Sequence, residues 1–179
     1  KIEIFYELNS EIKRIWLNLE SQASITVFQT YDWINVWDEY SRLNNYRNIM
    51  IITVKDLNNK CVAIFPLCKK KIFCYKQIEF IGDNFAEYKQ PLIDRSLTNY
   101  EVKKIWDKIK EHISDYDIFI VERYPLRIED RIHNFDLKKI GFKYLSFENS
   151  VSTKRFDNKD NFINQVSKRT LKDNKRYKR

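Results

Sequence analysis

Glycine is nearly absent from this chain, with only Gly82 and Gly141 among 179 residues. A phosphate-binding loop of the Walker or dinucleotide type needs two or three closely spaced glycines, and the GxSxG nucleophile elbow needs two. Neither pattern can be drawn on this sequence. Enzymes whose chemistry depends on such a loop are therefore excluded.

Length and composition predict an ordinary packed domain, because 43% of the residues are hydrophobic and a chain of this size buries about 70% of its unfolded surface. The longest apolar run, residues 61–68, is far shorter than the ~20 residues that span a bilayer, so no transmembrane segment is expected. Cys61, Cys68 and Cys74 fit neither a disulfide framework nor a zinc pattern. We expect reduced thiols in the core, which favours a reducing cytoplasm.

Positive charge is concentrated at the end of the sequence. Residues 154–179 carry a net charge of +7 out of a total of +8, so the preceding 153 residues are almost neutral. The charged segment has little apolar surface beyond Phe162, Ile163, Val166 and Leu171. The body is therefore electrostatically ordinary, and the terminal segment needs its own explanation.

The pattern of apolar residues predicts alternating elements of both kinds. Strands are expected at residues 1–6, 49–54, 61–67, 77–81, 118–121, 142–147 and 151–156, and helices at 10–20, from 31 onward, 97–114, 128–140 and from 157 onward. The run 118–121 is apolar throughout, which predicts burial on both faces. Short connections predict that the strands 49–54, 61–67 and 77–81 are consecutive and antiparallel. The later strand–helix–strand order implies a mixed sheet covered on both faces.

Two helices carry especially clear signals. The helix at 10–20 has Asn9 or Ser10 as a cap and Trp16 on its apolar face. The helix at 97–114 begins with a capping box, Thr98 to Glu101, and its apolar face includes Trp106. Both tryptophans are expected in the core.

Several short motifs resemble a known family. They are FQTYDWINVW at 28–37, IFPL at 64–67, IEFIG at 78–82, PLID at 91–94 and SKRTLKDNKR at 167–176, with KKIGF at 138–142. They resemble the CelD/BcsL-like acyltransferases of the GNAT superfamily, bacterial proteins associated with cellulose and other exopolysaccharide pathways. The resemblance implies an α/β (α+β) fold: a GNAT-like, mixed, largely antiparallel central sheet with helices on both faces, plus a C-terminal basic helix.

Members of that group are usually longer and contain two GNAT-like halves. The resemblance therefore implies that residues 1–156 are an N-terminal, substrate-side half and that residues 157–179 are a basic connector helix toward a second half. The implied activity is CoA-dependent N-acyl transfer to an amino sugar or cell-surface polysaccharide precursor. The family binds acetyl-CoA or another acyl-CoA in a glycine-rich turn of the second half.

The loop that follows residues 77–81 does not fit that cofactor. It reads Asp-Asn-Phe-Ala-Glu-Tyr from Asp83 to Tyr88, which is acidic and has no further glycine. Such a loop repels a pyrophosphate instead of holding it. We therefore expect this segment by itself to be inactive and to bind acetyl-CoA weakly or not at all.

Four polar residues in expected loops or helix starts are candidates for binding the substrate: Gln29, Asp32, Tyr88 and Asp94. Asp32 has an alternative role as a first-turn acid that complements the helix dipole, and this role is favoured. Tyr124 lies where the resemblance implies a general acid, although it has no leaving group to protonate without a CoA site.

Three aromatic residues and two histidines are further candidates for binding. Tyr31, Trp33 and Trp37 could stack on a sugar ring, but the spacing of the two tryptophans favours a helix face packed in the core. His112 and His133 are isolated from each other and from carboxylates at ligand spacing, so exposed helix positions are expected. We expect no metal site.

The basic terminal helix leaves two interpretations. Lys168, Arg169, Lys172, Lys175 and Arg176 either line a connector that contacts the second half or belong to a non-catalytic binding module that contacts nucleic acid or an anionic membrane. The neutral body and the absence of a nucleic-acid-binding signature favour the connector, so nucleic acid is not expected as a partner.

Overall fold

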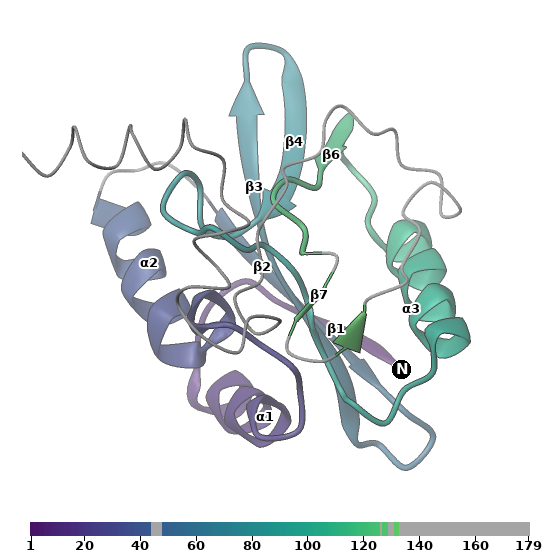
Figure 1. Cartoon of the computed structure of the whole chain (residues 1–179). Coiled ribbons are helices and arrows are strands. Elements are labelled where there is room, and N and C mark those ends of the chain that lie inside the picture. The colour runs from purple at the N-terminus through teal and green to yellow at the C-terminus, as the bar shows by residue number, and fades with distance from the viewer. Residues whose placement is uncertain (44–47, 126, 129–130, 133–179) are drawn as a thin grey trace, which may run out of the picture. The chain divides into compact units, whose positions relative to one another are not determined.

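The computed structural model describes residues 1–43, 48–125, 127–128 and 131–132, which belong to one compact unit. Its centre is a mixed sheet of six strands (Figure 1). Helices α1 (Ser10–Glu20) and α2 (Tyr31–Leu43) cover one face, and α3 (Asn99–His112) covers the other. The expected mixed, largely antiparallel sheet with helices on both faces is therefore confirmed for this part of the chain.

Five strands follow one another across the sheet in the order β1, β2, β3, β4 and β6. Their bounds are Ile2–Phe5, Asn48–Lys55, Cys61–Ile72, Tyr75–Phe80 and Ile118–Ile120, and β5 (Leu92–Ile93) pairs with the beginning of β3. The first four pair antiparallel, as predicted. Strand β6 returns through α3 and pairs parallel with β4, from Gln77 opposite Ile118 to Glu79 opposite Ile120.

The face under α1 and α2 is an aliphatic core reinforced by aromatic residues. Asn9 caps α1 by accepting a hydrogen bond from the Ile12 amide at 3.0 Å. Trp16 is fully buried and donates its indole N–H to the backbone oxygen of Gln29 at 3.0 Å, in the short 3-10 helix η1 (Val27–Gln29). This bond places η1, and hence the start of α2, against the sheet.

The opposite face is an aromatic core around Trp106. Thr98 caps α3 in the predicted capping box with Glu101. The Trp106 ring lies edge-on to Phe65 at 4.9 Å and to Phe80 at 6.1 Å between centroids. Edge-to-face packing of this kind is favourable because it brings ring edges against the negative faces. Trp106 is fully buried, as expected.

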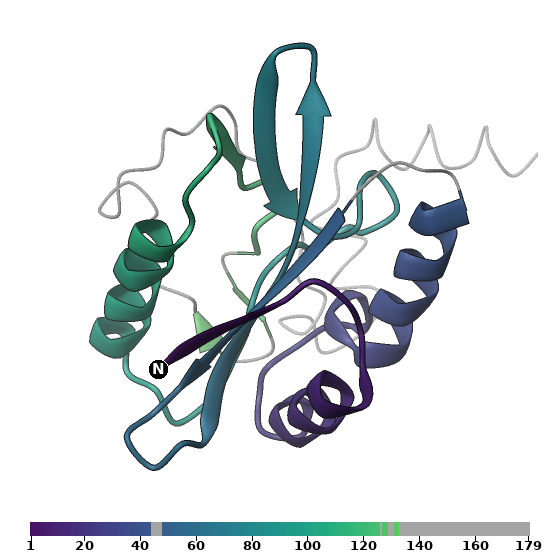
Figure 2. The same ribbon diagram turned by 180° about the vertical axis from the view of Figure 1, so that it is seen from behind.

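Strand β3 is longer than the sequence pattern indicated, because it continues from Leu67 to Ile72. The extra residues pair with Tyr75 to Glu79, almost the whole of β4, and form a hairpin that projects beyond the helices (Figures 1 and 2). Cys74 lies in its two-residue turn and is exposed, so the expectation of three core thiols is wrong for this cysteine. Cys61 and Cys68 are buried as expected.

Two further expectations are corrected. Ile118 is 43% exposed and the rest of β6 is half-buried, whereas burial on both faces was expected, because in the described residues β6 ends the strand order and pairs on one side alone. The helix expected from residue 128 does not begin there, because strand β7 (Arg127–Ile128) pairs antiparallel with β8 (Arg131–Ile132). The spacing of apolar residues over so short a segment does not distinguish a helix from a hairpin.

The remaining expectations fall on residues 133–179, outside the described residues. They are the end of the helix at 140, the strands at 142–147 and 151–156, the boundary at 156/157 and the basic helix.

Candidate functional site

The loop that follows β4, residues 82–91, lies at the edge where the parallel pairing of β4 and β6 ends. We call it the post-β4 loop. It opens with Gly82 at a φ of +129°, and a Cβ there would lie 2.4 Å from the Ala86 Cβ and 3.3 Å from the Trp33 ring. The amides of Phe85 and Ala86 donate to the Gly82 oxygen at 2.9 and 3.0 Å. Glycine is therefore required for a tight turn that packs on α2.

Arg123, just beyond β6, holds the other side of the post-β4 loop. Its guanidinium donates to the backbone oxygens of Asn84 at 3.2 Å and Ala86 at 3.0 Å, and its own backbone oxygen accepts from the Lys89 amide at 3.1 Å. Lys89 is 3% exposed and lies 3.5 Å from the Glu122 carboxylate. The loop therefore directs two backbone carbonyls toward the Arg123 guanidinium, and the amides of Phe85 and Ala86 are used inside the loop. A site for pyrophosphate needs the reverse, with free amides directed toward the ligand.

Gln29 connects η1 to the post-β4 loop and is 2% exposed. Its amide nitrogen donates to the backbone oxygen of Tyr88 at 2.7 Å, and its amide oxygen accepts from the Thr26 amide at 3.0 Å and hydroxyl at 2.8 Å. The structure therefore brings two predicted site residues into direct contact. Because protein groups occupy its amide, Gln29 positions the Tyr88 backbone instead of presenting a free amide to solvent.

An aromatic cluster of Phe28, Trp33 and Tyr88 borders this contact. Phe28 lies edge-on to Trp33 at 5.5 Å and is tilted toward Tyr88 at 6.5 Å between centroids. Tyr88 is 39% exposed, so the cluster reaches the surface. Asp32 is exposed in the first turn of α2, where a carboxylate complements the helix dipole.

Trp37 takes the core role that spacing favoured, Trp33 is half-buried against the same core, and Tyr31 is also buried there. Trp37 is 4% and Tyr31 is 6% exposed, and both belong to the core cluster. Tyr31 packs edge-on against Trp16 at 6.0 Å. The surface available for stacking therefore includes Tyr88 and excludes these two side chains.

Asp94 lies at the far end of the segment that begins with Tyr88, apart from the aromatic cluster. Its carboxylate accepts from the Lys60 ammonium at 2.7 Å and from the Ser96 amide and hydroxyl at 2.9 and 2.8 Å. Burial acts to raise the pKa of this carboxyl, but the hydrogen bonds from Lys60 and Ser96 outweigh it and hold the pKa below its ordinary value. Asp94, directly after β5, is thus ionised and is held by Lys60, directly before β3, and by Ser96.

Tyr124 is on the other side of the sheet from the Gln29–Tyr88 contact. Its ring lies 6.4 Å from that of Trp106 in the α3-side core. Burial raises the pKa of the phenol, and the hydrogen bond with Trp106 only partly offsets this. Tyr124 is therefore a protonated donor at neutral pH, and the structure does not bring it together with the four predicted substrate residues.

Sequence reasoning missed a polar cluster on the β3–β4 hairpin. Glu79 is 5% exposed, and its carboxylate accepts from Lys70 at 3.1 and 3.2 Å and from the Gln77 amide at 2.9 Å. The Cys68 thiol lies 3.9 Å away. The alternation Gln77-Ile78-Glu79 was the available signal, because residues two apart share a face of a strand.

A polar hollow of about 490 Å³ lies between α1 and the turn from β2 to β3. It is lined by Glu11, Arg14, Ile15, Asn18, Lys55, Asn59, Lys60 and Cys61, and none of the predicted site residues is among them. Burial raises the pKa of the Cys61 thiol to about 11, so this cysteine is not an activated nucleophile.

His112, expected at an exposed helix position, lies there at the end of α3 and contacts the Lys108 oxygen at 2.9 Å. His133 is outside the described residues. Within the described ranges, no group of three or more His, Cys, Asp or Glu side chains could hold a metal ion. In the same part of the chain no helix combines the length and apolar character needed to cross a membrane.

No protein-family model matches the chain, and no curated protein matches its sequence.

Proposed function

We propose that this chain is the N-terminal, substrate-side half of a GNAT-type N-acyltransferase that acetylates an amino sugar or cell-surface polysaccharide precursor. The observation that carries the proposal is the parallel pairing of β4 with β6, the one parallel strand pair among the described residues, whose other pairs are antiparallel. Its connection through α3 is the arrangement implied by the family resemblance of the sequence motifs.

A parallel pair suits this chemistry because both strands end at the same edge, and ligands of open sheets bind beyond carboxyl ends of strands. In this chain Arg123 and the post-β4 loop occupy that edge. Together with the acidic Asp83 and Glu87, this supports a division in which acetyl-CoA binds the second half and this half binds the acceptor.

The acceptor is proposed to bind at the aromatic cluster. A sugar ring combines an apolar C–H face with polar edges, and an exposed tyrosine supplies both an apolar ring and a hydroxyl. Tyr88 provides that ring, while the nearby Asp32, three residues after Gln29 in the sequence, adds a carboxylate suited to a protonated amine. Gln29 contributes by fixing the Tyr88 backbone.

In the longer enzyme, the bound amine must first lose its extra proton. The neutral nitrogen then attacks the thioester carbonyl, the C–S bond breaks, the nitrogen gives up a further proton, and the CoA thiolate takes one up. A neutral phenol can donate that proton, but the candidate from the sequence, Tyr124, is buried against Trp106 on the other side of the sheet from the aromatic cluster. No catalytic role is proposed for it in this segment alone.

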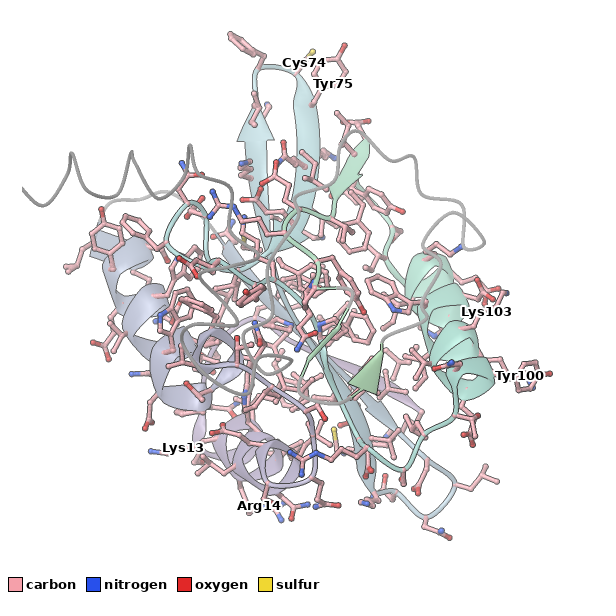
Figure 3. All side chains as sticks on the ribbon, in the orientation of Figure 1. Lys13, Arg14, Cys74, Tyr75, Tyr100 and Lys103 are labelled. Carbon is pink, nitrogen blue, oxygen red and sulfur yellow. The ribbon has the colours of Figure 1, made fainter. Side chains whose placement is uncertain are left out.

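Calorimetric titration of the 179-residue chain tests the division of roles. We expect no saturable binding of acetyl-CoA tighter than about 1 mM, and weak saturable binding of glucosamine that is lost in Tyr88→Ala. Tyr100→Ala is the control, because Tyr100 is a more exposed tyrosine, 66% against 39% for Tyr88, and lies on α3 (Figure 3). Low-micromolar affinity for acetyl-CoA would overturn the proposed division.

The binding-module alternative is tested separately. Replacing Lys168, Arg169, Lys172 and Lys175 with glutamine is expected to leave the fold intact and to change only weak, salt-sensitive affinity for DNA. A nanomolar, sequence-selective DNA complex abolished by these four changes would replace the acyltransferase proposal.

A further inference from the structure

The tip of the β3–β4 hairpin is an exposed apolar cap formed by Ile72, Phe73, Cys74 and Tyr75. Phe73 is 92%, Tyr75 54% and Ile72 40% exposed. Figure 3 shows Cys74 and Tyr75 at the end of the hairpin, away from both helical layers. Single exposed apolar residues are common on proteins, but four in succession at a projecting tip indicate an interaction site.

The backbone of this tip is unfavourable for its sequence. Phe73 occupies the first position of a two-residue hairpin turn with a φ of +54°. Glycine, asparagine or aspartate normally fills such a position, because a bulky side chain is strained there. The strained backbone therefore carries an aromatic ring that is almost fully exposed to solvent.

Basic residues surround the apolar cap. Residues 69–76 contain four lysines and no acidic residue: Lys69, Lys70, Lys71 and Lys76. Lys70 pairs with Glu79 and Lys76 with Asp115, whereas Lys71 is exposed one residue behind the cap. The hairpin therefore has an apolar end followed by a basic collar, which we define as Lys69 and Lys71, because the ammonium groups of Lys70 and Lys76 are held in ion pairs.

We propose that the β3–β4 hairpin docks this protein on an anionic lipid bilayer, with the apolar cap entering the headgroup region and the basic collar contacting lipid phosphates. At about 3.4 Å per strand residue, Lys71 lies directly behind the cap, and Lys69 lies about 10 Å behind Ile72, where the cap begins. Interfacial segments enter a bilayer by about 5–10 Å, so the collar reaches the phosphate level.

A bilayer fits these observations better than a protein partner. A stable protein interface buries about 800 Å² on each side, which four side chains at a narrow tip cannot supply. A bilayer needs no matching pocket, and its negative surface complements the collar. The inference is independent of the proposed acyltransferase function, because it uses no residue of the post-β4 loop or the aromatic cluster.

The test is sedimentation of the full chain with vesicles of phosphatidylcholine, with or without about 30% phosphatidylserine. Every variant, including the parent, carries the glutamine substitutions at Lys168, Arg169, Lys172 and Lys175, which lowers the net charge of residues 154–179 from +7 to +3 equally in all of them. We expect partitioning into the anionic vesicles that falls by about tenfold or more in Phe73→Gly. Lys71→Gln should weaken it by about fivefold.

Two controls keep the result interpretable. Leu57→Ser removes an equally exposed apolar side chain from the turn between β2 and β3, at the other end of the sheet, and should leave partitioning unchanged. Glycine suits the backbone at position 73, so the thermal midpoint of Phe73→Gly should not fall. A fluorophore on Cys74, the exposed one of the three cysteines, should shift to the blue with anionic vesicles.

Three outcomes would overturn the proposal. One is equal partitioning of the parent chain and Phe73→Gly; another is failure of the parent chain to sediment with anionic vesicles. The third is a change of oligomeric state in Phe73→Gly by analytical ultracentrifugation without a change in vesicle binding, which would assign the tip to a second copy of the chain.

Discussion

The two turns that flank β3 lie at opposite ends of the strand and differ in whether the residue with positive φ suits that conformation. In the turn from β2, Asp56 accepts hydrogen bonds from the amides of Asn58 and Lys60, both at 2.9 Å. The residue with positive φ there is Asn59, at +64°, a type that tolerates this conformation. In the turn to β4, the residue with positive φ is Phe73.

This difference separates a structural turn from one selected for another purpose. At the β2–β3 turn, side-chain chemistry and backbone conformation agree, so the turn forms from local forces. At the β3–β4 turn they conflict, and strain of this kind is commonly retained at functional sites. The conflict supports the inference that the apolar cap contacts something outside the chain.

Thiol reactivity gives the largest expected contrast between the two ends of β3. Cys74 should react with a disulfide reagent at pH 8 at least ~100-fold faster than Cys61, because the thiolate is the nucleophile and burial raises the pKa of Cys61 to about 11. Stopped-flow kinetics measures the phases. Cys74→Ser should remove the fast phase, and a second fast thiol in that variant would contradict the assignment.

Removal of the Asp56 carboxylate should have the next largest effect. Asp56→Ala deprives the amides of Asn58 and Lys60 of their acceptor and should lower the free energy of unfolding by about 1–2 kcal/mol in urea denaturation. Leu57→Ala is the control, since Leu57 is fully exposed and should change stability little. An equal loss in both variants would show that the hydrogen bonds contribute nothing.

Phe73→Gly should act in the opposite direction. Glycine relieves the positive φ, so the free energy of unfolding should rise by about 1 kcal/mol. Asn59→Gly, at the β2–β3 turn, should change it by only a few tenths of a kcal/mol, because asparagine already tolerates the conformation. If Phe73→Gly and Asn59→Gly change the free energy of unfolding equally, the two turns do not differ in backbone strain.

The smallest effect is expected from the ion pair that ties the end of the β2–β3 turn to the body. The folded pKa of Asp94 is lowered, so the folded state favours its ionised form, and this stability is present above pH 3.8 and lost as pH falls through the folded pKa. Lys60 is half-exposed, which weakens the pair through solvent screening. Asp94→Asn should flatten the pH dependence of unfolding in this range; an unchanged slope would contradict it.

Much of the predicted site could be located but not interpreted from the sequence. Gln29 and Tyr88 were identified as polar loop candidates, yet their contact joins residues 59 positions apart, which no local pattern reveals. Glu79 was missed because its strand was interpreted only as an apolar run. Whether a buried carboxylate has partners depends on the neighbouring strand, here through Lys70.

The sequence by itself determined the elements whose signals are short-range. The caps at Asn9 and Thr98, the apolar faces bearing Trp16 and Trp106, and the antiparallel order of β2, β3 and β4 follow from spacing and short connections. Tertiary structure alone decided the length of β3, the small strand β5 and the half-exposure of β6. The strand β5 and the exposure of β6 depend on pairing with residues distant in sequence, and the extension of β3 depends on pairing across the hairpin with β4. In each case a strand is stabilised by its neighbours more than by its own residues.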